Sequence, residues 1–383
     1  MSVSASSWTA KNALIHRTPF VLERQESPYR IVNDTETANG TILNAIADLF
    51  PGYFALVMAT GITSIAAYLL DMKPVAWALL YVNVAAFVLL WLMLIVRLTR
   101  FFSRALADLN DHVRGPGFFT VVAATCVLGS QLVIVAGAFE VAAVLWFVGL
   151  LCWVVVMYAF FTAVTVRMNK PPLEKGVSGS WLIAVVATQS ISVLGTILSS
   201  EYAGHAEILL FFTLCMYMIG CMLYIILITL IFYRFTFLDI TREVLTPPYW
   251  INMGAVAITT LAGARLILSA PSWTLINEIN PFLKGFTLFF WSAGTWWIPL
   301  LFILGFWRHA VKKFPIRYDP QFWGMVFPLG MYTACTFQLS IALGFPPLMI
   351  IPKFFIYLAL AAWIITFGAM LYTWMPKNRS NAS

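Results

Sequence analysis

Long apolar segments alternate with short polar ones along most of the chain, and this pattern predicts ten membrane-spanning helices. Each segment approaches or exceeds the roughly 20 residues that a helix needs to cross the hydrocarbon of a bilayer. A helix is required there because backbone polar groups must be satisfied within the segment. The predicted helices cover residues 51–70, 75–97, 117–136, 139–164, 179–200, 206–232, 249–269, 281–306, 321–343 and 353–375.

Every second segment begins with an aromatic residue and continues with many Gly, Ala, Ser and Thr residues. The five leading aromatics lie 63 to 73 residues apart: Tyr53, Phe118, Trp181, Trp250 and Trp323. One helical hairpin cannot bury its own small-residue face, whereas five can do so by closing into a ring. The pattern predicts five hairpins around a central pore, with the odd-numbered helices inside and the bulkier even-numbered helices facing lipid. Small residues also serve tight packing without a pore, and this alternative stays open.

Composition agrees with an all-α polytopic membrane protein. The chain is 61% hydrophobic and only 10% charged, which is far from the balance of a soluble domain. Of its 23 basic residues, only Lys73, Arg265, Lys284 and Lys353 fall outside the tails and the loops after the even helices. The positive-inside rule makes the basic side cytoplasmic, so both termini are expected in the cytoplasm. The expected location is the bacterial inner (plasma) membrane.

The expected organisation is a cytoplasmic tail over residues 1–40, a ten-helix domain over 41–375 and a second tail over 376–383. No signal peptide is expected, because the first forty residues contain no apolar core segment. Apolar residues recur at helical spacing over residues 41–50, before Pro51 and Gly52. This stretch predicts either a helix along the membrane interface or an early start of the first spanning helix.

The sequence contains no pattern that favours catalysis. Cysteines and histidines show no metal-ligand spacing, and there is no phosphate-binding glycine loop and no nucleophile with a base at a recognisable spacing. We therefore expect no enzyme activity, no catalytic residue, no metal and no cofactor. The charge of +7 reflects the topological bias of the loops, so no nucleic-acid partner is expected.

Aligning the repeats on their leading aromatic residue predicts layers of pore-lining side chains. Offsets of 4, 7 and 11 residues stay on one face of a helix. The predicted lining residues are Val57, Thr60, Ser64, Val122, Thr125, Gly129, Val185, Thr188, Ser192, Gly254, Ala257 and Gly330.

Two further residues have predicted roles along this passage. Phe327 shares a layer with small residues and precedes Pro328, whose kink would tilt the ring into the axis as a gate that excludes water. Packing between helices is the alternative for Phe327. Arg265 lies about a turn inside its helix near the outer end, where its charge would attract anions. Its alternative is snorkelling to the lipid headgroups.

Five motifs stand out along the chain: Pro51-Gly-Tyr-Phe-Ala-Leu-Val-Met-Ala-Thr-Gly61, Arg114-Gly-Pro-Gly-Phe-Phe-Thr120, Ala187-Thr-Gln189, Pro247-Pro-Tyr-Trp-Ile-Asn-Met-Gly-Ala255 and Trp323-Gly-Met-Val-Phe-Pro-Leu-Gly330. Together they resemble the tellurite-resistance/dicarboxylate transporter family, which includes the plant guard-cell slow anion channels. The resemblance spans residues 50 to 375. It implies five hairpins around a pore, a homotrimer, small inorganic or carboxylate anions as cargo, and Phe327 as the gate. Long kinase-regulated tails like those of the plant channels are not expected here, so neither is control by phosphorylation.

Two functions are compatible with these residues. One is an anion-selective channel in the lipid bilayer whose flux follows voltage and concentration. The other is a proton-coupled carrier of a C4-dicarboxylate, sulfite or a tellurite-type anion. No acidic residue lies well inside a predicted span, which favours the channel. A protonated substrate would carry its own proton and would escape this argument.

Overall fold

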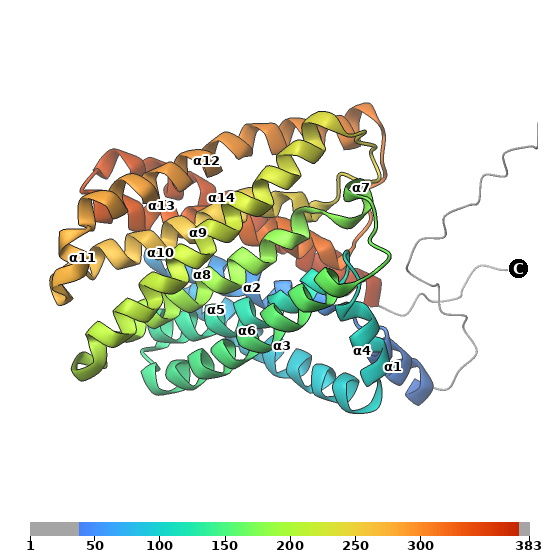
Figure 1. Ribbon diagram of the computed structural model, residues 1–383, viewed down its shortest axis with the longest axis horizontal. Helices are drawn as coiled ribbons and strands as arrows, with labels where there is room; N and C mark the ends of the chain where they lie inside the picture. Colours follow the sequence, from blue (N-terminus) through green and yellow to red (C-terminus); the bar gives the residue numbers. More distant parts are fainter. Residues whose placement is uncertain (1–37, 375–383) are drawn as a thin grey trace, which may run out of the picture. The chain divides into compact units, whose positions relative to one another are not determined.

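The structure, a computed structural model, describes residues 38–374, and these form helices joined by short connections (Figure 1). The compact unit that carries the long helices begins at Asn44. The two tail predictions lie largely or wholly outside the described residues. Helix α1 (Ala38–Ala47) ends before the first spanning segment and is separated from it by residues 48–50. The prediction that the first spanning helix starts early is therefore wrong.

Ten described helical segments are long and apolar enough to cross a membrane, as predicted. Their main helices are α2 (Ala55–Leu69), α3 (Lys73–Arg100), α5 (Phe119–Ala136), α6 (Phe139–Val166), α8 (Ile183–Leu198), α9 (Ala206–Phe237), α10 (Ile251–Leu268), α12 (Asn280–Phe306), α13 (Trp323–Leu343) and α14 (Ile350–Trp374). Shorter helices lie between them: α4 (Phe102–Leu109), α7 (Leu173–Gly176) and α11 (Thr274–Glu278).

Burial separates the spanning helices into two classes. In the windows of α2, α5, α8, α10 and α13, between 83% and 94% of residues are buried, against 17% to 44% for the other five. The buried helices are the small-residue helices of the sequence pattern. They contact one another in a closed cycle, from α2 to α5, α8, α10, α13 and back to α2. Each also contacts one exposed helix that follows it in the chain: α3, α6, α9, α12 or α14.

A 3₁₀ turn precedes each buried helix. The five turns are η1 (Pro51–Phe54), η2 (Gly115–Phe118), η3 (Gly179–Leu182), η5 (Pro247–Trp250) and η8 (Pro320–Phe322). Four of them contain proline in the first two positions, where a fixed helical φ is useful and a missing N–H has no consequence. These turns also contact one another in a closed cycle, which we call the collar.

Glycine allows the turns of the collar to approach backbone to backbone. A β-carbon on Gly117 would lie 2.8 Å from the amide nitrogen of Gly52, and one on Gly179 would lie 2.3 Å from the carbonyl oxygen of Pro248. Real β-carbons do not approach backbone atoms so closely, so a larger residue at either position would push two turns apart.

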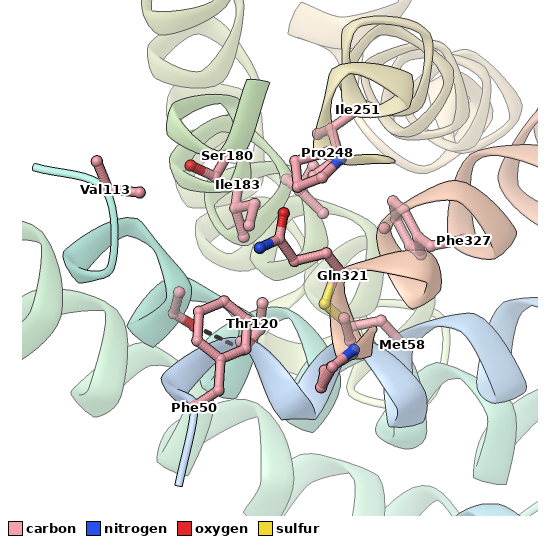
Figure 2. Close-up of a pocket in the computed structure, with 16 residues that line it drawn as sticks. Phe50, Met58, Val113, Thr120, Ser180, Ile183, Pro248, Ile251, Gln321 and Phe327 are labelled. Atoms are coloured by element: carbon pink, nitrogen blue, oxygen red, sulfur yellow. Dashed lines mark hydrogen bonds between the residues drawn. The ribbon is translucent and has the colours of Figure 1, made fainter. Parts of the chain in front are cut away.

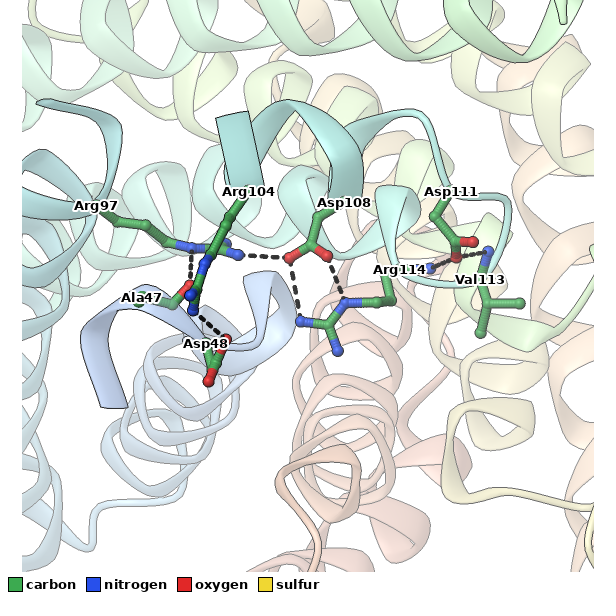
Figure 3. A network of polar contacts seen from close by, with 8 residues as sticks. All are labelled: Ala47, Asp48, Arg97, Arg104, Asp108, Asp111, Val113 and Arg114. Carbon is green, nitrogen blue, oxygen red and sulfur yellow. Dashed lines mark hydrogen bonds and ion pairs between the residues drawn. The ribbon is translucent and has the colours of Figure 1, made fainter. Parts of the chain in front are cut away.

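An ionic network connects α4 to the end of α3 and to the loop before η2 (Figure 3). Asp108 accepts hydrogen bonds from Arg97 at 2.5 Å and from Arg114 at 2.7 and 3.0 Å. Arg97 is buried and also donates to the carbonyl oxygen of Ala47 at 3.2 Å. Arg97 and Arg114, which count among the basic residues that predict the cytoplasmic side, therefore also hold the loop between α3 and η2 in place. We call this end of the unit, with the collar and the Arg-rich loops, the basic end.

Candidate functional site

A narrow cavity of about 40 Å³ lies inside the collar, and all five repeats line it (Figure 2). Its volume admits only two or three water molecules. We number the five repeats from Pro51, Pro116, Gly179, Pro247 and Pro320, each of which is the first residue of its turn except Pro116, which follows Gly115 in η2. The residue at the second position of each repeat lines the cavity: Gly52, Gly117, Ser180, Pro248 and Gln321. The residue at the fifth position of each repeat also lines it: Ala55, Thr120, Ile183, Ile251 and Gly324.

The deepest lining residues occupy the eighth position of their repeats. These are Met58 on α2, Val186 on α8 and Phe327 on α13, and the corresponding residues of the other two repeats are Ala123 and Gly254. The ring of Phe327 is 1% exposed. The cavity that begins among the turns of the collar thus reaches a layer in which Phe327 is the one aromatic side chain.

Two glycines make room for the first turns of α13. A β-carbon on Gly254 would lie 2.8 Å from Cγ of Pro328 and 3.5 Å from Cδ1 of Phe327, so α10 and α13 meet closely here. Gly324 presents only hydrogen to the cavity. Pro328 has no N–H to donate to the carbonyl oxygen of Gly324, which interrupts the helical hydrogen bonding one turn below the ring. The segment that carries Phe327 therefore has fewer internal restraints than a regular helix.

This register differs by one residue from the alignment on the leading aromatic. In the first three repeats that aromatic is the third residue, whereas Trp250 and Trp323 are the fourth residues of their repeats and follow Tyr249 and Phe322. Gly254 and Phe327 keep their shared layer. Val57, Val122 and Val185 lie one residue before it, are 0% exposed and are not among the residues that line the cavity, whereas Met58 and Val186 are.

The predicted hydroxyl lining points toward the outer helices. Trp363 of α14 donates its indole N–H to Thr60 at 2.9 Å, and Trp153 of α6 donates to Thr188 at 2.8 Å. Ser64 donates to the carbonyl oxygen of Ala76 on α3 at 2.7 Å. These contacts favour tight packing, the alternative that the sequence left open, over a hydroxyl-lined passage.

The remaining predicted lining residues also lie within the packed bundle. Ser192 donates to the carbonyl oxygen of Thr213 on α9 at 2.8 Å, and Thr125 donates to Val121 on its own helix at 2.7 Å. Ala257 is 1% exposed, and Gly129 and Gly330 face side chains of neighbouring helices, Leu194 and Ile62. None of them lines the collar cavity.

Arg265 is half-buried near the end of α10 that is remote from the collar. It is the nineteenth residue of its repeat, eleven after Gly254, and this spacing keeps both on one face of the helix. Among the described residues, its guanidinium forms no ion pair. A positive charge without a carboxylate partner is therefore available on the face of α10 that carries Gly254.

Asp319 directly precedes Pro320 and Gln321, which line the cavity, and was not singled out from the sequence. Its Oδ1 accepts a hydrogen bond from the backbone N–H of Gln321 at 2.8 Å and so caps η8. Burial raises the pKa of this carboxyl, although the hydrogen bond to Gln321 and the charge of Arg308 act in the opposite direction. The sequence signal that could have identified Asp319 is the Asp-Pro pair at the start of the last repeat, because Asp followed by Pro is typical of a helix start.

Comparison with known proteins identifies the family. The model of the voltage-dependent anion channel family (SLAC1) matches residues 48–371. An uncharacterized membrane protein of Mycobacterium tuberculosis is 39% identical over 150 residues, which cover 39% of this chain and 76% of that protein. An uncharacterized transporter of Methanocaldococcus jannaschii is 28% identical over 300 residues, 76% of this chain and 84% of the relative.

A third relative has a named activity. The sulfite efflux pump SSU1 of Trichophyton rubrum is 25% identical over 364 residues, 87% of this chain and 93% of the pump. The family match covers all ten spanning helices apart from the last residues of α14 and confirms the resemblance drawn from the motifs. The chain is an integral membrane protein of anion transport and belongs to the voltage-dependent anion channel family.

Proposed function

We propose that this chain is a passive anion channel whose pathway runs along the axis of the five inner helices and is closed by Phe327. The observation that carries the proposal is the collar cavity, to which every repeat contributes its second and fifth residues. Five equivalent contributions to one cavity are expected of a pathway on the axis of a ring. A cavity in the seam between two helices would instead be lined by two or three repeats.

The register of the collar extends the proposed pathway beyond Phe327. Residues that follow the eighth position by four and seven remain on the same helix face. They are Ile62, Val127, Ser190, Ile258 and Met331, then Ile65, Ser130, Val193, Leu261 and Ala334. On α10, Arg265 follows Leu261 by four residues and so lies one turn farther along the same face. The proposed lining is thus mostly apolar, with one cation at the far end.

An apolar lining gives a permeating anion little in exchange for its hydration shell. Weakly hydrated monovalent anions such as nitrate should pass at least as well as chloride, and dianions should pass poorly. In the described structure, α2, α5, α8, α10 and α13 contain no Asp, Glu or His residue, so none of these common proton relays lies on them. This absence supports a channel over a carrier.

The second candidate is a proton-coupled carrier. The similarity to a protein named as a sulfite efflux pump favours it. C4-dicarboxylate and tellurite-type anions belong to the same candidate, because a weak acid can bring its own proton.

Orientation with both termini in the cytoplasm of a bacterial inner membrane and assembly as a homotrimer complete the proposal. Mass measurement of the purified protein in detergent tests the trimer.

Zero-current potentials separate the two candidates. Purified full-length protein is placed in a planar bilayer, first with a tenfold pH gradient and symmetrical chloride. A potential near zero supports the channel, and a clear shift toward the proton equilibrium potential supports the carrier. A tenfold chloride gradient at symmetrical pH provides the positive control, since an anion channel should then approach the chloride equilibrium potential. Protein that shows no anion-dependent potential in either gradient would contradict both candidates.

A further inference from the structure

A second cavity, of about 110 Å³, lies behind the first turns of α13. Phe322 and Met325 line this cavity, whereas Gly324 and Phe327 line the collar cavity. The end of η8 and the first turn of α13 therefore separate the two spaces. The other walls come from η5 and the residues before it, with Thr246 and Tyr249, and from the end of α12. We call this space the rear cavity.

Arg308 and His309 bring cationic chemistry to the rear cavity. Both belong to η7 (Trp307–Val311), a π-helical turn that continues α12. Such turns are rare and occur frequently at functional sites, because the extra residue re-aims the side chains next to it. Here the turn directs two neighbouring basic residues toward the same space.

The side chain of Arg308 is only 8% exposed, yet it forms no ion pair with any carboxylate in the part of the chain that the structure describes. Its Nε donates to the carbonyl oxygen of Arg242 at 2.9 Å, and its guanidinium carbon lies 4.2 Å from the ring centre of Phe314. No hydrogen bond of its two terminal nitrogens to a described residue accompanies these contacts. The carboxylates of Asp319 and Glu243 act on this guanidinium only from beyond ion-pair distance, so an anion in the cavity would be its first direct ionic partner.

His309 adds a second polar group. Its Nδ1 lies 3.0 Å from the carbonyl oxygen of Phe314, which selects the tautomer that carries the proton on Nδ1. Nε2 then carries a lone pair and accepts hydrogen bonds, so it can pair with the O–H of a hydrogen phosphate or of a water molecule, while the guanidinium of Arg308 supplies the donors for the anionic oxygens. A planar guanidinium beside an imidazole suits an oxygen-rich anionic group, since Arg binds carboxylate and phosphate oxygens in a two-pronged geometry.

We propose that the rear cavity binds an anionic oxygen group, carboxylate or phosphate, through Arg308 and His309, and that occupancy biases the position of the first turns of α13. The group can come from a soluble small anion or from the headgroup of an acidic lipid. The rear cavity is larger than the collar cavity and can hold one such group with a few water molecules. The gating consequence rests on the proposed function, whereas the binding site does not.

Binding is tested by thermal unfolding of the purified full-length protein. The first arm adds inorganic phosphate or malate in detergent, and the second compares phosphatidylcholine nanodiscs with and without phosphatidylglycerol. A ligand that binds the folded state should raise Tm in at least one arm. Arg308→Gln should raise the probe concentration needed for a given rise of Tm by about tenfold or more, since a hydrogen bond to a charged group is typically worth about 1.5–3 kcal/mol. The arm that responds identifies the source of the anion.

Arg317→Gln is the matched control, because this substitution removes the same charge from an exposed arginine of the following loop. Arg317 does not line the rear cavity. An equal rise of Tm in wild type and in Arg308→Gln, or no rise in either arm, would overturn the site. If Arg308→Gln does not fold, Gly305→Leu replaces it. Gly305 lines the rear cavity, and a β-carbon there meets no atom within 4 Å. This variant should keep the arginine and still lose the response.

Bilayer currents then separate the site from its effect on the gate. The probe that raised Tm is added on the basic side, and it should change the open fraction of wild type and of Arg317→Gln but not of Arg308→Gln. Arg308-dependent binding with unchanged currents would overturn the coupling to α13 and leave the site standing. Arg308-dependent binding by a protein that conducts no anion would instead contradict the proposed channel.

Discussion

Gly254 of α10 lies directly against the segment of α13 that carries Phe327: a β-carbon on this glycine would lie 3.5 Å from Cδ1 of the ring. The neighbouring Pro328 is closer still, with Cγ 2.8 Å from the same point. The absence of a side chain at position 254 therefore sets how far the ring and the proline can lie toward α10. Position 254 controls the candidate gate even though it contributes no bulk of its own.

Phe327→Ala should raise anion conductance severalfold or more. The ring is the largest group of its layer, and a methyl group would leave Met58, Ala123, Val186 and Gly254 to close the axis. Single-channel recording of the purified variant measures the change. Phe337→Ala, farther along α13 and outside the collar cavity, is the control. Unchanged or lower current from a folded and inserted Phe327→Ala protein would count against the gate.

Gly254→Ala should lower stability and disturb the gate together. The added methyl group would overlap Pro328, and overpacking of this kind typically costs about 1–3 kcal/mol. The measurements are Tm in detergent and the open fraction in bilayers. Gly285→Ala on α12 is the matched control, because its β-carbon meets nothing within 4 Å and alanine favours helix. Equal Tm values for the two variants would contradict the close contact.

Arg265→Ala should reduce anion conductance by up to about tenfold at low salt. Its charge acts through the local potential, so the deficit should shrink as salt shortens the Debye length from about 10 Å at 0.1 M. Conductance is measured over a range of chloride concentrations. Lys284→Ala, an exposed basic residue of the same end, provides the comparison and should have a smaller effect. Equal deficits at low and high salt would indicate a structural role for Arg265.

Asp319→Asn should increase anion current at neutral pH, because a carboxylate next to two lining residues of the collar cavity repels anions. Asparagine keeps the cap of η8, since it is as good an N-cap as aspartate. The ratio of variant to wild-type current should approach one as the pH falls and the wild-type carboxyl takes up a proton. A ratio that does not change with pH would contradict this role.

The same carboxyl makes a prediction for stability. Burial raises its pKa in the folded state above the ordinary value of 3.8, so the folded state keeps the proton to higher pH than the unfolded state does. Wild-type stability should therefore fall as the pH rises from about 3.8 through the folded pKa, and this loss should be missing in Asp319→Asn. Unfolding measured against pH for both proteins checks the sign.

Asp108→Ala should destabilise the fold by roughly 3 kcal/mol. Removing one partner of a buried ion pair leaves an uncompensated charge, and here the buried Arg97 loses its carboxylate. Asp48→Ala is the contrast, because its pair with Arg104 is exposed and should contribute about 0–1 kcal/mol. Chemical unfolding of both variants gives the comparison. Similar losses would mean that the Asp108 network does not anchor the loop.

The ten helices could be predicted because their length and apolar character follow directly from the thickness of a bilayer. The register of the repeats could not, because Tyr249-Trp250 and Phe322-Trp323 each offer two adjacent aromatics, and the chain pattern does not say which one is equivalent to the single leading aromatic of the other repeats. A shift of one residue rotates a helix by about 100°, and in the first and third repeats Thr60, Ser64 and Thr188 contact the outer helices. Thr60 and Thr188 show the second difficulty. Hydroxyls satisfy tryptophan N–H groups of outer helices as readily as they would line a passage.

The collar is formed by five repeats of one chain, and this has a consequence for its symmetry. In a ring of five identical subunits, any substitution would appear five times, and five phenylalanines in one layer would crowd the axis. Because the repeats are covalently linked, the eighth position can hold Met58, Ala123, Val186, Gly254 and Phe327 at once. One side chain can then obstruct the axis while the opposite wall stays small. Opening would require the movement of a single ring, and the turns would keep their backbone contacts throughout.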